Sequence, residues 1–187
     1  LNAPEATLYG IEAEYRTKFD SPIDIPFMDG EKVVFGLNYT YTFSEVSGTT
    51  EQVVDVTQLP SLVYVPASSF QLDGTQLQGT PENLANVEFG VESDDTSLTM
   101  LLGWVDERIA RRGLGGIPSV IEDPGINLDL VFRTNFDVWG NTMTLGLSGR
   151  NLLNEDHVEY QMSSAGKTSA NTYERGRSFS ASITAKY

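Results

Sequence analysis

The last ten residues of the chain, 178–187, alternate between apolar and polar side chains without a break. Successive side chains of a β-strand point to opposite faces, so this segment is predicted to be a strand with one apolar and one polar row. Such a strand suits a wall between hydrocarbon and water, or a half-buried strand of a soluble sheet. The apolar positions are Phe179, Ala181, Ile183, Ala185 and Tyr187.

Six earlier segments show the same alternation, and together they set the predicted fold class. The pattern predicts an all-β chain folded as an antiparallel up-and-down meander of about seven strands. We see no linker that would divide the chain into two domains. The seven segments are 7–17, 33–46, 84–93, 97–108, 125–136, 142–152 and 178–187.

Each strand is predicted to turn one row of side chains outward and one row inward. The outward row contains the apolar side chains, and aromatic rings at its ends would form an interfacial belt, because amphipathic rings prefer the headgroup level. A buried aromatic core is the alternative for the cluster in 39–43. Residues expected to face lipid or the interface are Tyr39, Tyr41, Phe43, Trp104, Phe179 and Tyr187; residues expected to face the interior are Glu12, Glu14, Arg16, Asp129, Arg133 and Arg150.

The connections between the predicted strands alternate between long and short. About 36, 16 and 20 residues follow the second, fourth and sixth strands, whereas only a few follow the third and fifth. The long connections should therefore share one end of the sheet. In bacterial outer-membrane barrels that end faces outward, which would place Tyr187 on the periplasmic side. The 18–32 connection is longer than a periplasmic turn is expected to be.

Composition narrows the classes of protein and partner. The 187 residues carry a net charge of −14, and a mean hydropathy of −0.21 is unlike that of a helical membrane protein. A strongly acidic chain without a basic patch is not expected to bind nucleic acid. The acidic balance would keep loops soluble or attract cations. The absence of cysteine excludes disulfides and thiolate chemistry.

Few residues suggest catalysis, and no enzymatic activity, cofactor or metal site is predicted. Glu12 and Glu14 share a face, as do Glu88 and Glu92, but no opposing carboxylate can be placed at the spacing that a glycosidase needs. The single His157 follows two acidic residues, and one histidine with flexible carboxylates makes a poor metal site.

Two loop motifs complete the candidate chemistry. The glycines of 113–116 lack the lysine and the strand–helix context of a phosphate-binding loop. Arg108, Arg111 and Arg112 form a basic run in a predicted outward loop, where they would either bind phosphates of an anionic ligand or lipopolysaccharide, or stay solvated.

Two motifs near the end of the chain carry a family resemblance. Asn151-Leu-Leu-Asn-Glu-Asp156 follows a strand, and Arg175-Gly-Arg-Ser-Phe179 opens the last strand about 20 residues later. This pairing resembles the C-terminal end of TonB-dependent outer-membrane receptors. Weaker matches in the family's order are Ala6-Thr-Leu-Tyr-Gly-Ile-Glu-Ala-Glu14, Asn38-Tyr-Thr-Tyr41, and Leu77-Gln-Gly79 with Pro81 and Asn86.

The resemblance implies that residues 1–187 are the C-terminal part of a large transmembrane β-barrel of about 22 strands, without its plug and earlier strands. It implies the bacterial outer membrane as the location and TonB-driven uptake of an iron chelate (a siderophore), a cobalamin or an oligosaccharide. Expected partners are outer-membrane lipid, the plug, the TonB complex and the nutrient. An isolated seven-stranded piece would have two open edges and should self-associate or need detergent.

Two rival interpretations follow from the same pattern. A soluble carbohydrate-binding β-sandwich would bury its apolar rows against each other, so Phe35, Leu130, Leu145 and Ile183 would lie beneath a second layer. A small complete outer-membrane barrel would need an eighth strand, which only 53–65 could supply, across Pro60.

Overall fold

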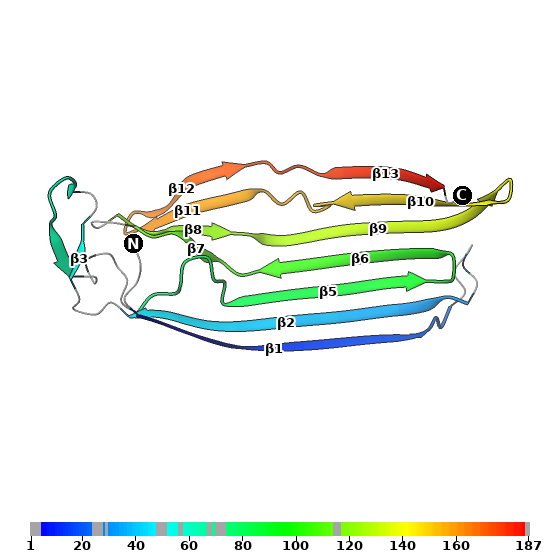
Figure 1. Cartoon of the computed structure of the whole chain (residues 1–187), viewed down its shortest axis with the longest axis horizontal. Coiled ribbons are helices and arrows are strands. Elements are labelled where there is room, and N and C mark those ends of the chain that lie inside the picture. Colours follow the sequence, from blue (N-terminus) through cyan, green and yellow to red (C-terminus); the bar gives the residue numbers. More distant parts are fainter. Residues whose placement is uncertain are drawn as a thin grey trace.

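The computed structural model describes most of the chain as β-structure (Figure 1). Among these residues no helix is long and apolar enough to cross a membrane. The predicted position of Tyr187 lies outside the described residues. The structure describes residues 5–23, 28, 30–47, 52–55, 58–66, 69, 74–113 and 117–185.

A seven-stranded antiparallel sheet is the main element, and it confirms the predicted meander. Its spatial order follows the chain, with β1 and β13 at the two edges (Figure 1). We call this sheet the wall. Its strands are β1 (Glu5–Asp20), β2 (Lys32–Ser47), β5 (Asn83–Glu92), β6 (Thr96–Val105), β9 (Gly125–Val138), β10 (Asn141–Arg150) and β13 (Ser178–Ala185).

The register of the wall brings the apolar rows of all seven strands onto one face. Directly opposite residues in an antiparallel pair point to the same face, so cross-strand partners can be followed from edge to edge. One polar row runs Glu14, Asn38, Asn86, Gly103 and Asn127. One apolar row runs Thr17, Phe35, Phe89, Met100, Leu130, Gly149 and Phe179.

No second layer covers the apolar face in the part of the chain that the structure describes. Phe35 and Leu145 are only half-buried, Leu130 is 38% exposed, and Ile183 is 65% exposed. A β-sandwich would bury these four side chains against a facing sheet. The wall is therefore a single layer whose apolar face is open, and the sandwich interpretation finds no support in the described residues.

A four-stranded sheet extends the wall at one end, which the sequence pattern did not predict. It consists of β7 (Arg108–Arg111), β8 (Val120–Asp123), β11 (His157–Ser163) and β12 (Gly166–Tyr173), in the order β12-β11-β8-β7. These strands continue β6, β9, β10 and β13 beyond short breaks, as Figure 1 shows. We call this element the outer sheet.

The connection after β2 contains a separate hairpin of β3 (Gln52–Val54) and β4 (Tyr64–Pro66). Val53 and Val65 pack against the fully buried Val46 together with Leu77. This hairpin adds no eighth strand to the wall, so the expectation of a wall strand at 53–65 in a small complete barrel is wrong for the described residues. Its strands are three residues long, and Pro60 lies between them.

The connections separate by length as predicted. Two short turns join β5 to β6 and β9 to β10 at the end marked C in Figure 1, where β1 also joins β2. Trp139 and Gly140 make the second turn with φ angles of 50° and 79°, as a two-residue hairpin turn requires. The outer sheet and the β3–β4 hairpin lie at the opposite end (Figure 1). We refer to these as the short-turn end and the long-loop end.

Candidate functional site

All six residues expected to face the interior lie on the polar face of the wall. Glu12, Glu14 and Arg16 lie together on β1, while Asp129 and Arg133 lie on β9 and Arg150 on β10. Three strands separate β1 from β9, so the structure forms two groups rather than one cluster. Each group finds its partners on neighbouring strands instead.

An ion pair crosses β2 on the polar face. Arg16 Nη2 lies 2.8 Å from Glu88 Oε2, although β1 and β5 are not adjacent. Gly36 of β2 is the cross-strand partner of both residues, and a Cβ at Gly36 would lie 3.3 Å from Glu88 Cβ. Because Gly36 has no side chain, the Arg16 side chain can reach across β2 to Glu88. Lys18 and Glu92 form a second pair closer to the short-turn end.

Amide side chains surround this ion pair and line a hollow of about 330 Å³. Asn38 Nδ2 donates to Glu12 Oε1 at 3.0 Å, and Asn127 Nδ2 donates to Asp129 Oδ1 at 2.9 Å. Gly103 adds further room beside them. The polar face therefore presents oriented donors and acceptors, which suit hydrogen bonding to a polar surface or a polar solute.

The described aromatic residues predicted for the interface lie on the open apolar face, towards the long-loop ends of their strands: Tyr39, Tyr41, Phe43, Trp104 and Phe179. Tyr187 lies outside the described residues. Tyr9 of β1 stacks on Phe43 with ring centroids 4.8 Å apart, and the Tyr39 hydroxyl donates to Asn83 Oδ1 at 2.6 Å. Tyr41 and Trp104 occupy the same face, and Tyr39 is exposed. The alternative interpretation of this cluster requires a buried aromatic core. The rings do not form one among the described residues.

The sequence analysis missed a second aromatic group at the short-turn end. Phe19 and Phe136 lie on the apolar face there, and both are exposed. Trp139 in the turn between β9 and β10 is 97% exposed. The sequence did contain a signal for this second group, because alternating segments carry an aromatic residue at their short-turn ends. These residues are the counterpart of the cluster in 39–43 at the long-loop end.

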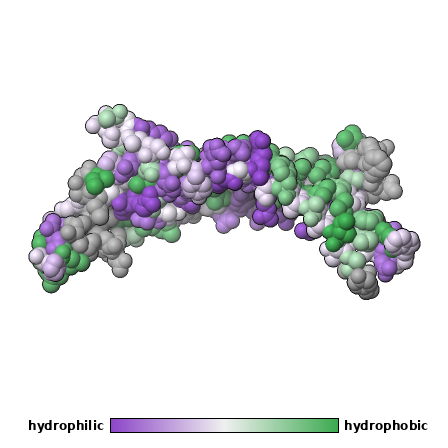
Figure 2. All heavy atoms as spheres, turned by 90° about the horizontal axis from the view of Figure 1, so that it is seen from above, coloured by the Kyte–Doolittle hydropathy of each residue, from purple (hydrophilic) through white to green (hydrophobic). Residues whose placement is uncertain are grey.

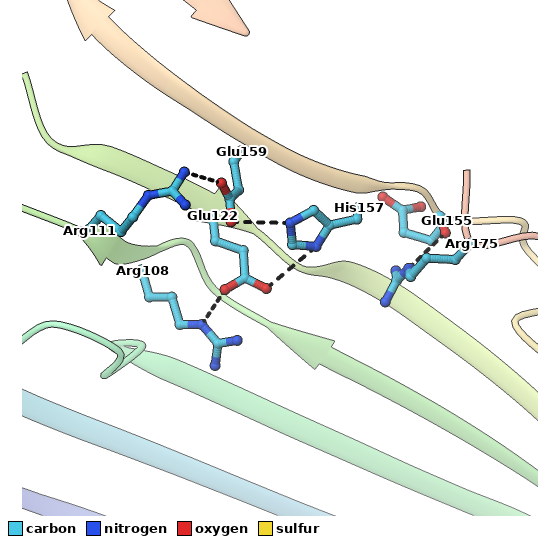
Figure 3. Close-up of polar contacts among 7 residues, drawn as sticks. All are labelled: Arg108, Arg111, Glu122, Glu155, His157, Glu159 and Arg175. Atoms are coloured by element: carbon cyan, nitrogen blue, oxygen red, sulfur yellow. Dashed lines mark hydrogen bonds and ion pairs between the residues drawn. The ribbon is translucent and has the colours of Figure 1, made fainter. Parts of the chain in front are cut away.

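A ladder of charges crosses the outer sheet at the long-loop end (Figure 3). Arg108 Nε lies 2.9 Å from Glu122 Oε2, and Arg111 Nη2 lies 2.7 Å from Glu159 Oε2. His157 lies between the two carboxylates, 3.3 Å from Glu159 and 3.9 Å from Glu122. Both arginines therefore have intramolecular partners, and the described residues contain no group of three metal-ligating side chains.

Packing surrounds this ladder on the outer sheet. His157 stacks on Tyr173 with centroids 4.6 Å apart, and Lys167 Nζ lies 3.6 Å above the ring of Tyr160. The pKa of Tyr160 is raised to about 12, mainly by burial and to a lesser extent by a hydrogen bond to the Glu107 carboxylate. Arg112, the third arginine of the basic run, donates to the Thr75 hydroxyl at 2.6 Å.

The two motifs that carry the family resemblance meet in space, at a point that we call the junction. Asn151 Nδ2 donates to the backbone oxygens of Glu155 (3.0 Å) and Gly176 (2.8 Å), and Asn151 Oδ1 accepts from the Glu155 amide at 2.9 Å. Arg175 Nε donates to the Glu155 oxygen and Arg177 Nε to the Leu152 oxygen. The spacing of these motifs in the sequence thus corresponds to one bonded unit between wall and outer sheet.

The junction is also bonded to the wall, since the backbone N–H of Asn151 donates to Asp129 Oδ1 at 2.9 Å. Asp129 therefore accepts a hydrogen bond from the turn and also contributes to the polar face.

Comparisons with protein-family models, with curated proteins and with solved structures found no match to this chain.

Proposed function

We propose that this chain forms part of the wall of a TonB-dependent outer-membrane transporter that takes up a scarce nutrient. One observation carries the proposal: seven strands present a continuous apolar face with no covering layer in the described residues. An exposed apolar surface of this extent is costly in water and favourable in a bilayer. Hydrophobic side chains also gather towards the short-turn end in Figure 2, and hydrophilic ones over the middle of that view.

The height of the apolar face supports a membrane location. On β2 the apolar row runs from Val33 to Phe43. Ten strand steps of about 3.3 Å span about 33 Å, and a tilt of about 40° reduces this to a height of about 25 Å. That height equals the apolar band of outer-membrane barrels, and the aromatic groups at both ends lie where headgroups would be.

The two edges of the wall favour a larger barrel. β1 and β13 each have a wall neighbour on one side only, and an open strand edge cannot be satisfied in hydrocarbon. In the proposed transporter, further strands of the same protein pair with both edges, and about 22 strands close the barrel. The long-loop end faces outward and the short-turn end faces the periplasm.

In this proposal the polar face lines the interior. Glu12, Glu14 and Arg16, together with the amides around the Arg16–Glu88 pair, bond to the plug or line the solute path. TonB supplies energy through the plug, and an iron chelate, a cobalamin or an oligosaccharide is the cargo. The wall supplies a rigid frame and no reacting group.

The absence of cysteine in this chain permits a direct test by single-cysteine scanning along β9. In membranes that contain the protein, a water-soluble maleimide should label position 129, 131 or 133 after Asp129→Cys, Val131→Cys or Arg133→Cys. Leu128→Cys, Leu130→Cys and Phe132→Cys should stay unlabelled until detergent is added, because lipid covers that row. Equal labelling of both rows would contradict the proposal.

Transport itself needs a second measurement. Cells that carry the whole protein should accumulate one of the three cargo classes, and an uncoupler that collapses the proton-motive force should stop accumulation. Uptake that persists with the uncoupler would refute the TonB-driven part, while the labelling result would still stand for the wall.

A further inference from the structure

A hollow of about 510 Å³ lies on the apolar face, over the middle of β9 and the junction ends of β10 and β13. Leu130, Phe132 and Phe179 form its sides. Gly149 and Ala181 lie between them, so two small residues interrupt an otherwise bulky surface. A hollow of this size is within the range of small-molecule sites, and its lining is mainly apolar.

The side chain of Leu152 closes the hollow towards the junction. A Cβ at Gly149 would lie 2.9 Å from Leu152 Cδ2 and 3.3 Å from the ring of Phe179. The hollow therefore exists because position 149 is glycine. Gly149 does not have a positive φ, so its backbone conformation alone does not demand glycine there.

A guanidinium is fixed beside this hollow. Arg177 Nε donates to the backbone oxygen of Leu152 at 3.0 Å, and Leu152 lines the hollow. Arg177 is exposed and directly precedes β13, whose second residue, Phe179, also lines the hollow. Arg175 is held in the same way, by the oxygen of Glu155 at 3.1 Å. Two cations are thus held at the junction, next to the β10 and β13 ends of the hollow.

We propose that this hollow binds a phosphorylated lipid, with an acyl chain along Gly149 and the phosphate on Arg177. The inference rests on the proposed function, because it needs the apolar face to lie in a membrane. Arginine forms strong charge-assisted bonds to phosphate, and here its Nε is already oriented by a backbone oxygen. The apolar lining and the adjacent cation match the two halves of such a lipid.

Lipid retention tests the proposal on the whole protein, purified in detergent and measured by native mass spectrometry. The probes are phosphatidylglycerol, which carries a phosphate, and diacylglycerol with the same acyl chains, which carries none. We expect wild-type protein to retain phosphatidylglycerol preferentially. Arg177→Gln should lower that preference about fivefold, since one arginine near an anionic surface contributes on the order of 1 kcal/mol.

Arg150→Gln is the matched control for the charge. Arg150 is the cross-strand partner of Ser178 at the same height, but on the polar face. The Arg150→Gln substitution removes one positive charge and leaves the hollow unchanged, so the preference for phosphatidylglycerol should stay at the wild-type value. An equal loss in both variants would show a general charge effect and overturn the proposal.

Gly149→Leu tests the apolar half, because its side chain would fill the hollow. Retention of both lipids should fall, whereas Gly146→Leu on the polar face should leave it unchanged. Heat-modifiable migration confirms that each variant has folded. Unchanged retention in a folded Gly149→Leu protein would refute the site.

The cysteine scan separates this inference from the proposed function. A protected apolar row combined with no lipid preference would overturn the lipid site alone. Two equally labelled rows would overturn the proposed function and the lipid site together.

Discussion

Four strands of the wall continue into the outer sheet, yet the most buried apolar side chains of the outer sheet contrast with the most exposed ones of the wall. In the outer sheet Tyr160 is 6% exposed and Ile109 is 9% exposed, although that sheet has only four short strands. In the much larger wall, Ile11 is 72% exposed and Phe179 is 73% exposed. Short breaks between β6 and β7 and between β8 and β9 separate the two regions.

The proposed function explains this contrast by two different solvents around the two regions. Proteins in water bury apolar side chains because burial removes apolar surface from water. Tyr160 and Ile109 of the outer sheet follow this rule, whereas Met162 and Tyr173 are more than half exposed. The charged residues Arg108, Glu122 and Glu159 there are paired rather than isolated. Much of the wall's apolar face departs from this rule, although Val33 is buried there. In the proposed transporter, hydrocarbon is the solvent outside this face and the membrane boundary lies near the breaks.

The largest expected effect, and the strongest test of the difference between the wall and the outer sheet, comes from placing a charge on the apolar face. Leu130→Arg, near the middle of β9, should destabilise the folded wall by about 2–4 kcal/mol in lipid vesicles, because a guanidinium at mid-depth must be removed from water. Val131→Arg, the next residue on the polar face, should cost less than about 1 kcal/mol. Urea titration of folding into vesicles measures both values.

The expected difference depends on the solvent. If water covered both faces, exposed Leu130 would accept arginine at a cost within about 0.5 kcal/mol. Two equal values would therefore remove the distinction between the wall and the outer sheet.

The next effect concerns the junction that separates the two sheets. Asn151→Ala removes three hydrogen bonds of one side chain and should cost about 2–3 kcal/mol. Asn154→Ala is a matched control, since Asn154 has a φ of 59° beside 53° for Asn151. The control changes the same left-handed backbone preference and should cost about 1 kcal/mol or less. Equal losses would show that backbone conformation alone fixes the junction.

The sequence predicted the wall well because its rule is local. A strand between two solvents must alternate at every step, so the alternation alone assigns Phe35, Leu130 and Ile183 to one face. The ends of the apolar rows also located one aromatic group, whose place at a membrane interface stays a prediction. Exposure and pairing of single residues were not predictable, because they depend on registers between strands far apart in the chain.

The outer sheet escaped prediction for physical reasons. β8 has four residues, too few to show a period of two, and β12 is mostly small and polar. Its ladder joins Arg111 to Glu159, which lie 48 positions apart. Arg108 and Arg111 were identified as a basic run, and His157 as a lone histidine, but nothing local indicated that the carboxylates would meet them.

Tyr160 offers a pH test of the buried side of the outer sheet. Its pKa of about 12 in the folded chain exceeds the ordinary value of about 10, so folding favours the neutral phenol. Its stabilising contribution is therefore complete below about pH 10 and is lost as the pH rises to about 12. The difference in phenolate absorbance between wild type and Tyr160→Phe should therefore rise around pH 12 and stay small near pH 10.

Glu107→Gln refines the same measurement, because it removes the carboxylate that bonds to the phenol. The difference absorbance should then develop at lower pH. A phenolate that forms near pH 10 in the wild type would contradict the burial of this side chain.

The smallest effect is expected from the ion pair on the polar face. Arg16 is 66% exposed, so a double-mutant cycle of Arg16→Gln and Glu88→Gln should give a coupling below about 1 kcal/mol. The coupling should vanish near 1 M salt if water fills the space above it. A coupling that survives salt would indicate that another part of the protein covers the pair.

The two tryptophans of this chain provide an optical marker at each end of the wall. Trp104 lies at the long-loop end and Trp139 in the turn at the other end. With one of them replaced by phenylalanine, the fluorescence of the other should respond to a membrane-impermeant quencher from one side of a vesicle only. Such a pair of proteins would report which way the chain has inserted, without an added label.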